Sequence, residues 1–108
     1  MENYTTKEGK TIALVSYFTI VGLIISLILN RDKKNYFASF HIRQSIGLHV
    51  LYFANKWIIF EYFNSNIGWG LRILILILFV IGAISALQEE EKLVPVVGEK
   101  FQEWFKNI

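Results

Sequence analysis

The chain has 108 residues, of which 54% are hydrophobic, eleven are basic and nine are acidic, for a net charge of +2. The hydrophobic fraction exceeds the ~45–50% of soluble domains, which argues against an ordinary soluble enzyme domain or a disordered chain. The sequence has no cysteine, which excludes thiol catalysis, disulfides and cysteine-based metal sites. The balanced charge gives no reason to expect a nucleic-acid partner, and we expect no cofactor.

The first hydrophobic segment covers residues 11–29 and contains no charged side chain. A bilayer core needs ~20 mostly apolar residues per helix. A cleavable signal sequence has a shorter apolar region that ends at a small-residue site, whereas this one ends in a polar, basic stretch at residues 30–35. We therefore predict a retained transmembrane helix over residues 11–29.

The second segment, residues 36–63, is mostly apolar but contains several charged or titratable side chains. We predict a helix that spans from about residue 40 to residue 60, with re-entry into the membrane as the alternative. At 3.6 residues per turn, a narrow polar stripe forms on one face of this helix. This polar stripe consists of His41, Ser45, His49, Tyr52 and Lys56.

Asn, Ser and Gly residues at 64–70 predict a turn, and residues 71–87 form the third predicted span. Pro95 begins a last predicted helix, about residues 95–107, whose apolar stripe includes Phe101, Trp104 and Phe105. This helix is too short and too charged to span, so we expect it at the membrane interface. The predicted fold is an all-α membrane protein, a single helical domain over residues 1–108 with three transmembrane helices and a C-terminal interfacial amphipathic helix.

Lysine and arginine counts predict the orientation, because cytoplasmic loops are enriched in these residues. With three spans, the side of the N-terminus carries Lys7, Lys10 and Arg72, and the other side carries Arg31, Lys33, Lys34, Arg43, Lys92, Lys100 and Lys106. We therefore predict a multi-pass inner-membrane protein with its N-terminus outside and its C-terminus in the cytoplasm. The basic residues 31–34 are typical of contact with anionic head groups.

The polar stripe has two interpretations. Its side chains either line a path for a substrate or proton, or they bond to neighbouring helices and stabilise the bundle. His41 and His49 lie two helical turns apart, too far for joint metal binding, so we expect no metal site. Ser45 lies one turn from both histidines, but no acid is placed to orient a base, so we expect no enzymatic activity.

Pairs of small residues four positions apart occur on two of the predicted spans. They are Gly22 and Ser26 on the first span, and Gly82 and Ala86 on the third. Small residues at this spacing let helix backbones approach closely. We expect them to pack helices within the chain, with self-association as the alternative.

The string Phe-His-Ile-Arg-Gln at residues 40–44, followed by Ser45, Gly47 and Leu48, resembles the Phe-His-x-Arg-Gln-Ala signature of a family of small bacterial membrane proteins of unknown function. That family is distantly related to the small four-helix membrane subunit of the chloroplast inner-envelope import translocon. Residues 30–37 and 94–106 also resemble its members. Ser45 stands where Ala is usual, and this chain has three predicted spans rather than four. The resemblance implies that His41, Arg43 and Gln44 are the signature positions.

We therefore expect a non-enzymatic integral membrane protein that acts as an import or translocon accessory or channel-like subunit. One alternative is a small homo-oligomeric transporter or channel that uses the polar stripe. Another is a structural membrane-stress or immunity-type protein. The expected partners are the lipid bilayer and either other membrane proteins or further copies of the chain.

Overall fold

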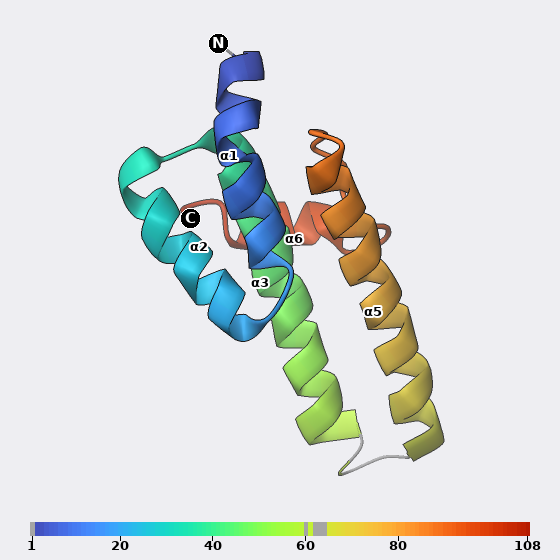
Figure 1. The fold of residues 1–108 in the computed structure, drawn as a ribbon. Coiled ribbons are helices and arrows are strands. Elements are labelled where there is room, and N and C mark those ends of the chain that lie inside the picture. Colours follow the sequence, from blue (N-terminus) through green and yellow to red (C-terminus); the bar gives the residue numbers. More distant parts are fainter. Residues whose placement is uncertain (1, 60, 62–64) are drawn as a thin grey trace.

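The computed structural model describes residues 2–59, 61 and 65–108, which form helices and their connections with no strand. The all-helical prediction is confirmed (Figure 1). The elements in chain order are α1 (Glu2–Ser16), α2 (Ile20–Lys33), α3 (Tyr36–Ala54), the π-helical segment η1 (Asn55–Ile59) that continues α3, α5 (Ser65–Leu87) and α6 (Gly98–Trp104).

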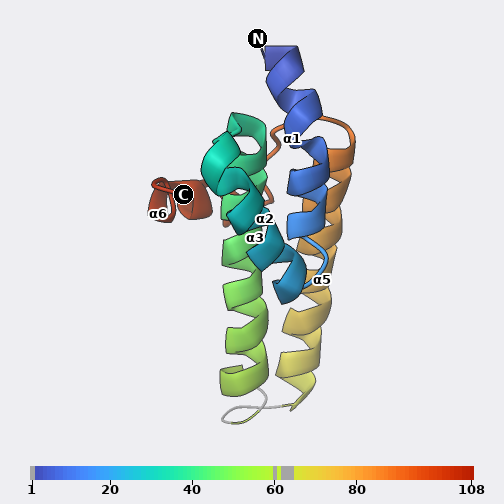
Figure 2. The same cartoon turned by 60° about the vertical axis from the view of Figure 1, so that its left-hand side comes forward.

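The helices form two hairpins of unequal length. In the long hairpin, α3 with η1 runs antiparallel to α5 over most of the length of the molecule (Figure 1). The short α1–α2 hairpin covers the half of it in which α3 begins and α5 ends (Figure 2). Helix α6 lies crosswise on α3 in the same half, so the N-terminus, the α2–α3 connection and the C-terminal elements gather there.

The prediction of one continuous helix over residues 11–29 is wrong, because the chain reverses at residues 17–19. Thr19 has an extended backbone, and its hydroxyl accepts a hydrogen bond from the amide of Gly22 at 3.1 Å, which caps the start of α2. With 14 residues, α2 is about 21 Å long and does not cross a hydrocarbon core of about 30 Å.

Two small residues make the tight reversal possible. A Cβ atom at Gly22 would overlap the carbonyl oxygen of Val15, so only glycine lets α2 approach α1 this closely. One turn later, Ser26 is fully buried and donates a hydrogen bond to the carbonyl of Ile12 at 2.8 Å. The partner of this small-residue pair is therefore the first half of the same predicted helix.

On α5, the second small-residue pair is buried, and its Gly82 lies against the reversal. A Cβ atom at Gly82 would lie 2.6 Å from the ring of Tyr17, and Ala86 is fully buried in the hydrophobic core. Tyr17, Phe37, Leu48, Val94 and Phe101 belong to the same core cluster. This core therefore lies where α1, α3, α5 and α6 meet. Helix α2 packs through a second, smaller cluster that Leu23 forms with apolar residues of α1 and α3.

The predicted last helix is shorter than expected. Helix α6 has seven residues, Gly98–Trp104, instead of about residues 95–107, and Pro95 does not begin it. The segment before it is irregular and is held against α3, because the backbone amide of the buried Val94 donates a hydrogen bond to Oε1 of Gln44 at 2.7 Å. Val96 in this segment has a positive φ of 73°, which is incompatible with an α-helical start.

Of the helices that the structure describes, α5 alone is long and apolar enough to cross a membrane, over Asn66–Leu87 with a mean hydropathy of 2.6. Only 28% of this window is buried inside the protein, unlike the core helix of a soluble domain. The apolar part of α2, Ile20–Arg31, is shorter. Helix α3 begins at Tyr36, where Asn35 caps it through a 2.9 Å bond to the amide of Ala38.

The predicted placement of the N-terminus and residues 30–35 on opposite sides does not fit the fold. A Cβ atom at Gly9 would overlap the side chain of Asn35, so the middle of α1 packs against the start of α3. Lys10 also forms an ion pair with Glu89 just after α5, with 3.5 Å between Nζ and Oε2. The two segments lie at the same end because the chain reverses at residues 17–19, so that the end of α2 lies near the start of α1.

Candidate functional site

The most concentrated buried polar chemistry lies where α1, α3 and α5 meet. The hydroxyl of Tyr17 is 2.6 Å from Nδ1 of His41, and Nε2 of His41 is 2.8 Å from the carbonyl oxygen of Glu90. A carbonyl only accepts hydrogen bonds, so Nε2 of His41 carries the proton and Nδ1 accepts from Tyr17. Gln44 completes this part by donating from Nε2 to the Tyr17 hydroxyl at 3.0 Å. This assignment makes His41 a neutral imidazole.

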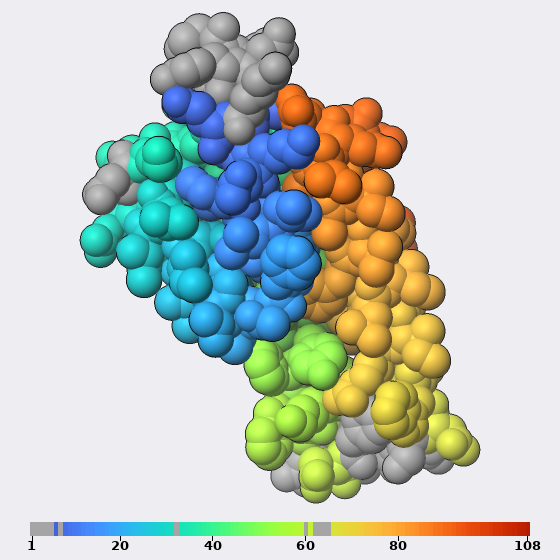
Figure 3. Space-filling view, in the orientation of Figure 1, coloured from blue at the N-terminus to red at the C-terminus, as the bar shows by residue number. Residues whose placement is uncertain are grey.

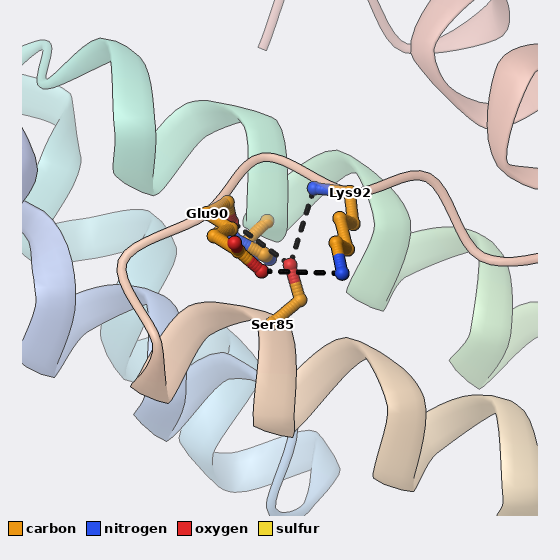
Figure 4. A network of polar contacts seen from close by, with 4 residues as sticks. Ser85, Glu90 and Lys92 are labelled. Atoms are coloured by element: carbon orange, nitrogen blue, oxygen red, sulfur yellow. Dashed lines mark hydrogen bonds and ion pairs between the residues drawn. The ribbon is translucent and has the colours of Figure 1, made fainter.

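The network extends into the segment that follows α5. The hydroxyl of Ser85 donates to the carbonyl of Glu90 at 2.8 Å and accepts from the amide of Lys92 at 3.1 Å (Figure 4). The side chains of Lys92 and Glu90 form an exposed ion pair at 3.4 Å. Together with the bond from Val94 to Gln44, these contacts hold residues 88–97 against the helices. Every side-chain nitrogen and oxygen of Tyr17, His41, Gln44 and Ser85 has a partner, so this polar network is closed.

Arg43, the third signature residue, points to α6. Its two terminal nitrogens donate to Oε1 of Gln102 at 3.3 Å and to the carbonyl of Lys106 at 3.2 Å. Gln102 in turn donates to the carbonyl of Phe40 at 2.8 Å. All three signature residues therefore connect α3 to chain that follows α5, which gives the motif at residues 40–44 a physical role.

The three aromatic residues predicted for the interface lie in different surroundings. Phe101 is 3% exposed, and its ring lies on Gly47, where a Cβ atom would overlap it. Phe105 is half-buried against the core, and Trp104 is 65% exposed. Phe101 therefore anchors α6 to α3, while Trp104 faces outward.

The polar stripe is divided by burial. His41, Ser45 and His49 are buried, Tyr52 is half-buried and Lys56 is exposed. Ser45 donates to the carbonyl of Ser16 at the end of α1, and Nδ1 of His49 is 2.8 Å from the carbonyl of Ser45. The upper part of the polar stripe, which consists of the buried residues His41, Ser45 and His49, thus forms its hydrogen bonds within the bundle.

Two residues of the polar stripe border a cavity of about 410 Å³ that is also lined by residues of the α1–α2 reversal. His49 and Tyr52 contribute to its wall, together with Thr19 and apolar residues of α5. The guanidinium of Arg72 lies 5.0 Å from the centre of the Tyr52 ring, and the ammonium of Lys56 lies 5.6 Å from that of Trp57. These cation–π contacts belong to the end of the long hairpin farthest from the termini.

The proximity of Ser45 to His49 does not make a nucleophile–base pair. Their Oγ and Nδ1 atoms are 3.2 Å apart, but the Ser45 proton is engaged by the carbonyl of Ser16 and Nδ1 of His49 donates to a carbonyl. Among the side chains that the structure describes, no group of three or more His, Cys, Asp or Glu residues is placed to hold a metal.

Sequence reasoning missed several residues that position the site. Tyr17 was hidden within the first predicted span, and Ser85 within the third. The α2–α3 connection is held by Asn30, which donates to Ser39 at 2.8 Å and accepts from the amide of Asn35 at 2.9 Å. Asn30 and Asn35, one on each side of the basic turn, were the sequence signal for these hydrogen bonds.

A scan against models of protein families, a search of curated proteins and a search of solved structures each found no match. The function proposed below therefore draws on the geometry of the chain and on the motif at residues 40–44.

Proposed function

We propose that the chain is a non-enzymatic integral membrane protein in which the long hairpin crosses the bilayer. Helix α5 has 23 residues, and α3 with η1 has 24 from Tyr36 to Ile59. At 1.5 Å per residue these helices are about 35 Å long, enough for a hydrocarbon core of about 30 Å. The α1–α2 hairpin enters from one side and returns to it, so the chain crosses twice rather than three times.

The observation that carries this proposal is the large apolar surface that the helices expose, around an interior that holds polar groups beside the hydrophobic core. Large apolar side chains point outward along α2 and α5, while the buried interior holds the closed polar network. On the face that Figure 3 shows, α1 and α2 cover one half of α3, while the other half of α3 and the whole length of α5 are uncovered. The outward residues include Val21, Ile24, Ile25 and Ile28 on α2, and Ile73, Leu74, Leu76, Ile77, Val80 and Ile84 on α5. Such a continuous apolar surface is stable in lipid and aggregates in water.

The two-crossing arrangement also concentrates basic residues. The half that contains the termini carries Lys10, Arg31, Lys33, Lys34, Arg43, Lys92, Lys100 and Lys106, whereas the opposite half carries Lys56 and Arg72. The positive-inside rule then places both termini in the cytoplasm, in contrast to the orientation predicted from three spans.

The topology can be tested by cysteine labelling, because the natural chain has no cysteine. We expect Glu8→Cys and Asn107→Cys to react with a membrane-impermeant maleimide from the cytoplasmic side only. Glu61→Cys is expected to react from the opposite side only. Labelling of Glu8 and Asn107 from opposite sides would instead indicate three crossings, and labelling of all three from one side would exclude a crossing hairpin.

Within the membrane, we propose an accessory role in a larger complex, as the resemblance to import-component proteins implies. The closed network favours packing over conduction for the upper part of the polar stripe, and the uncovered faces of α3 and α5 offer surface to a neighbouring helix. A photo-crosslinking amino acid at Val50 or Ile77, both exposed, is expected to give a discrete adduct with another membrane protein in native membranes. Adducts with lipid alone would argue against this role. The same probe at Lys100, outside these faces, is the control.

The cavity beside His49 and Tyr52 favours a second candidate, a small homo-oligomeric channel. In that case Tyr52→Cys would react with a small water-soluble thiol reagent in the membrane, and reaction would block a measurable conductance in planar bilayers. An accessory subunit without a water path would show neither effect. Ser45 is unsuitable for this probe because its side chain is fully buried and bonded to α1.

A further inference from the structure

A second cavity, of about 500 Å³, opens between the end of α2, the start of α3 and the last residues of the chain. Its polar rim contains Arg31, Lys34, Arg43 and Lys106, which come from three separate parts of the sequence. Leu27 and Ile42 contribute apolar wall. The residues that line this basic pocket include no aspartate or glutamate.

Among the side chains that the structure describes, no aspartate or glutamate balances the positive charge of this basic pocket. No ion pair joins any of its four cationic side chains to a carboxylate among the side chains that the structure describes. Arg43 uses two of its five N–H donors, for Gln102 and for the carbonyl of Lys106. Its Nε atom is buried and has no partner within the described part of the chain. A buried donor on a charged group is costly, so an acceptor of opposite charge would stabilise this site.

We propose that the basic pocket binds the phosphate head group of an anionic phospholipid, with an acyl chain against Leu27 and Ile42. Guanidinium and ammonium groups together are suited to phosphate oxygens. A pocket lined by both cationic and apolar side chains matches a molecule that is charged at one end and apolar at the other. A basic cleft between helices at the cytoplasmic side of a membrane is a recognised setting for such lipids.

This inference rests on the proposed membrane position, in which the basic pocket lies in the cytoplasmic half. A phosphate held by Arg31, Arg43 and Lys106 would bridge α2, α3 and the segment after α6. The lipid would therefore fix the C-terminal segment on the bundle, in addition to the direct bonds from Arg43. Binding would thus stabilise the half of the protein that contains the core.

The test uses the full chain in nanodiscs of phosphatidylcholine, with and without phosphatidylglycerol as the minor lipid. Native mass spectrometry after release counts the lipids that each chain retains. The test variant is Arg31→Gln with Lys106→Gln, which keeps the Lys106 carbonyl that Arg43 needs. The matched control is Lys33→Gln with Lys100→Gln, which removes the same charge from the same half but outside the pocket lining. Arg43 is left intact because its loss would also release α6.

We expect the natural chain and the control to retain phosphatidylglycerol in preference to phosphatidylcholine. The pocket variant should bind phosphatidylglycerol about 10- to 30-fold more weakly, as expected for two lost charges near the membrane surface. Equal weakening in both variants would overturn the site in favour of diffuse surface charge. Displacement of the lipid by excess inorganic phosphate would identify a free anion as the ligand and would also overturn the proposal.

Insertion into phosphatidylcholine nanodiscs separates the two levels of inference. A chain that fails to insert there contradicts the proposed function itself. A chain that inserts but shows no preference for phosphatidylglycerol contradicts only the lipid site.

Discussion

The hydroxyl of Tyr17 donates a 2.6 Å hydrogen bond to Nδ1 of His41, and their rings meet edge to face with centroids 5.5 Å apart. This bond joins the end of α1 to the second turn of α3, across 24 positions of sequence. It exists only because the chain reverses directly after Tyr17, which brings that side chain to the apex of the short hairpin. The reversal and the polar network are therefore one structural feature.

Replacing Tyr17 by phenylalanine removes the hydroxyl alone. Nδ1 of His41 then loses its donor and Nε2 of Gln44 loses its acceptor, both in a buried environment. We expect the free energy of unfolding to fall by about 1–3 kcal/mol, the usual cost of unsatisfied buried polar groups. Thermal unfolding in detergent, followed by circular dichroism, measures the change. Tyr36→Phe is the control, because Tyr36 is 79% exposed, and an equal effect of the two substitutions would show that the Tyr17 hydroxyl is unimportant.

Gln44→Leu tests how the segment after α5 is held. This substitution keeps most of the side-chain volume but removes the acceptor for the amide of Val94 and the donor to Tyr17. We expect residues 88–97 to detach more often, so that trypsin cleaves after Lys92 about tenfold faster, as the loss of about 1–2 kcal/mol of local bonding implies. Mass spectrometry identifies the cleavage site. The exposed Gln88→Leu serves as the comparison, and an unchanged rate for Gln44→Leu would mean that other contacts hold the segment.

Much of the helical fold was predictable from sequence, because long apolar runs identify α3 and α5. The predicted turn at residues 64–70 is wrong, because α5 already begins at Ser65. The reversal at residues 17–19 was not predictable. Composition does not distinguish two short apolar helices from one long apolar helix. The cap at Thr19 is a single residue within an uncharged run. The Gly22 and Ser26 pair indicated close packing, but composition does not say that the partner is the preceding half of the same segment.

For each hydrogen bond of the candidate site, only one of the two partners was predictable from sequence. Helical spacing placed His41, Ser45 and His49 on one face, and the motif identified Gln44. Their partners include the carbonyls of Ser16 and Glu90 and the amide of Val94. Backbone groups are present at every residue, so no residue type in the sequence marks them as partners. Only the tertiary fold reveals that the signature residues hold the C-terminal segment.

Gly47→Ala tests the docking of α6. A Cβ atom at Gly47 would overlap the ring of Phe101, which is buried and has little room to move. We expect a loss of about 1–3 kcal/mol of stability, typical of overpacking in a core. Gly70→Ala is the matched control, since nothing lies within 4 Å of its added methyl group. In α5 that change should stabilise by up to about 1 kcal/mol through helix propensity, so the two variants should shift the melting temperature in opposite directions. Shifts in the same direction would contradict the proposed contact.

The short α1–α2 hairpin predicts that the start of α1 and the end of α2 lie close together. Spin labels on Glu8→Cys and Lys33→Cys would be about 38 Å apart if one straight helix joined them, because 25 residues separate the two positions. With the reversal at residues 17–19, we expect a much shorter distance in both detergent and nanodiscs, measured by double electron–electron resonance. Tyr36→Cys with Phe53→Cys gives the internal standard, since 17 residues within the single helix α3 correspond to about 26 Å. A Glu8–Lys33 distance near the straight-helix value, with the α3 standard intact, would exclude the short hairpin. The Tyr17–His41 bond, which depends on the reversal, would be excluded with it.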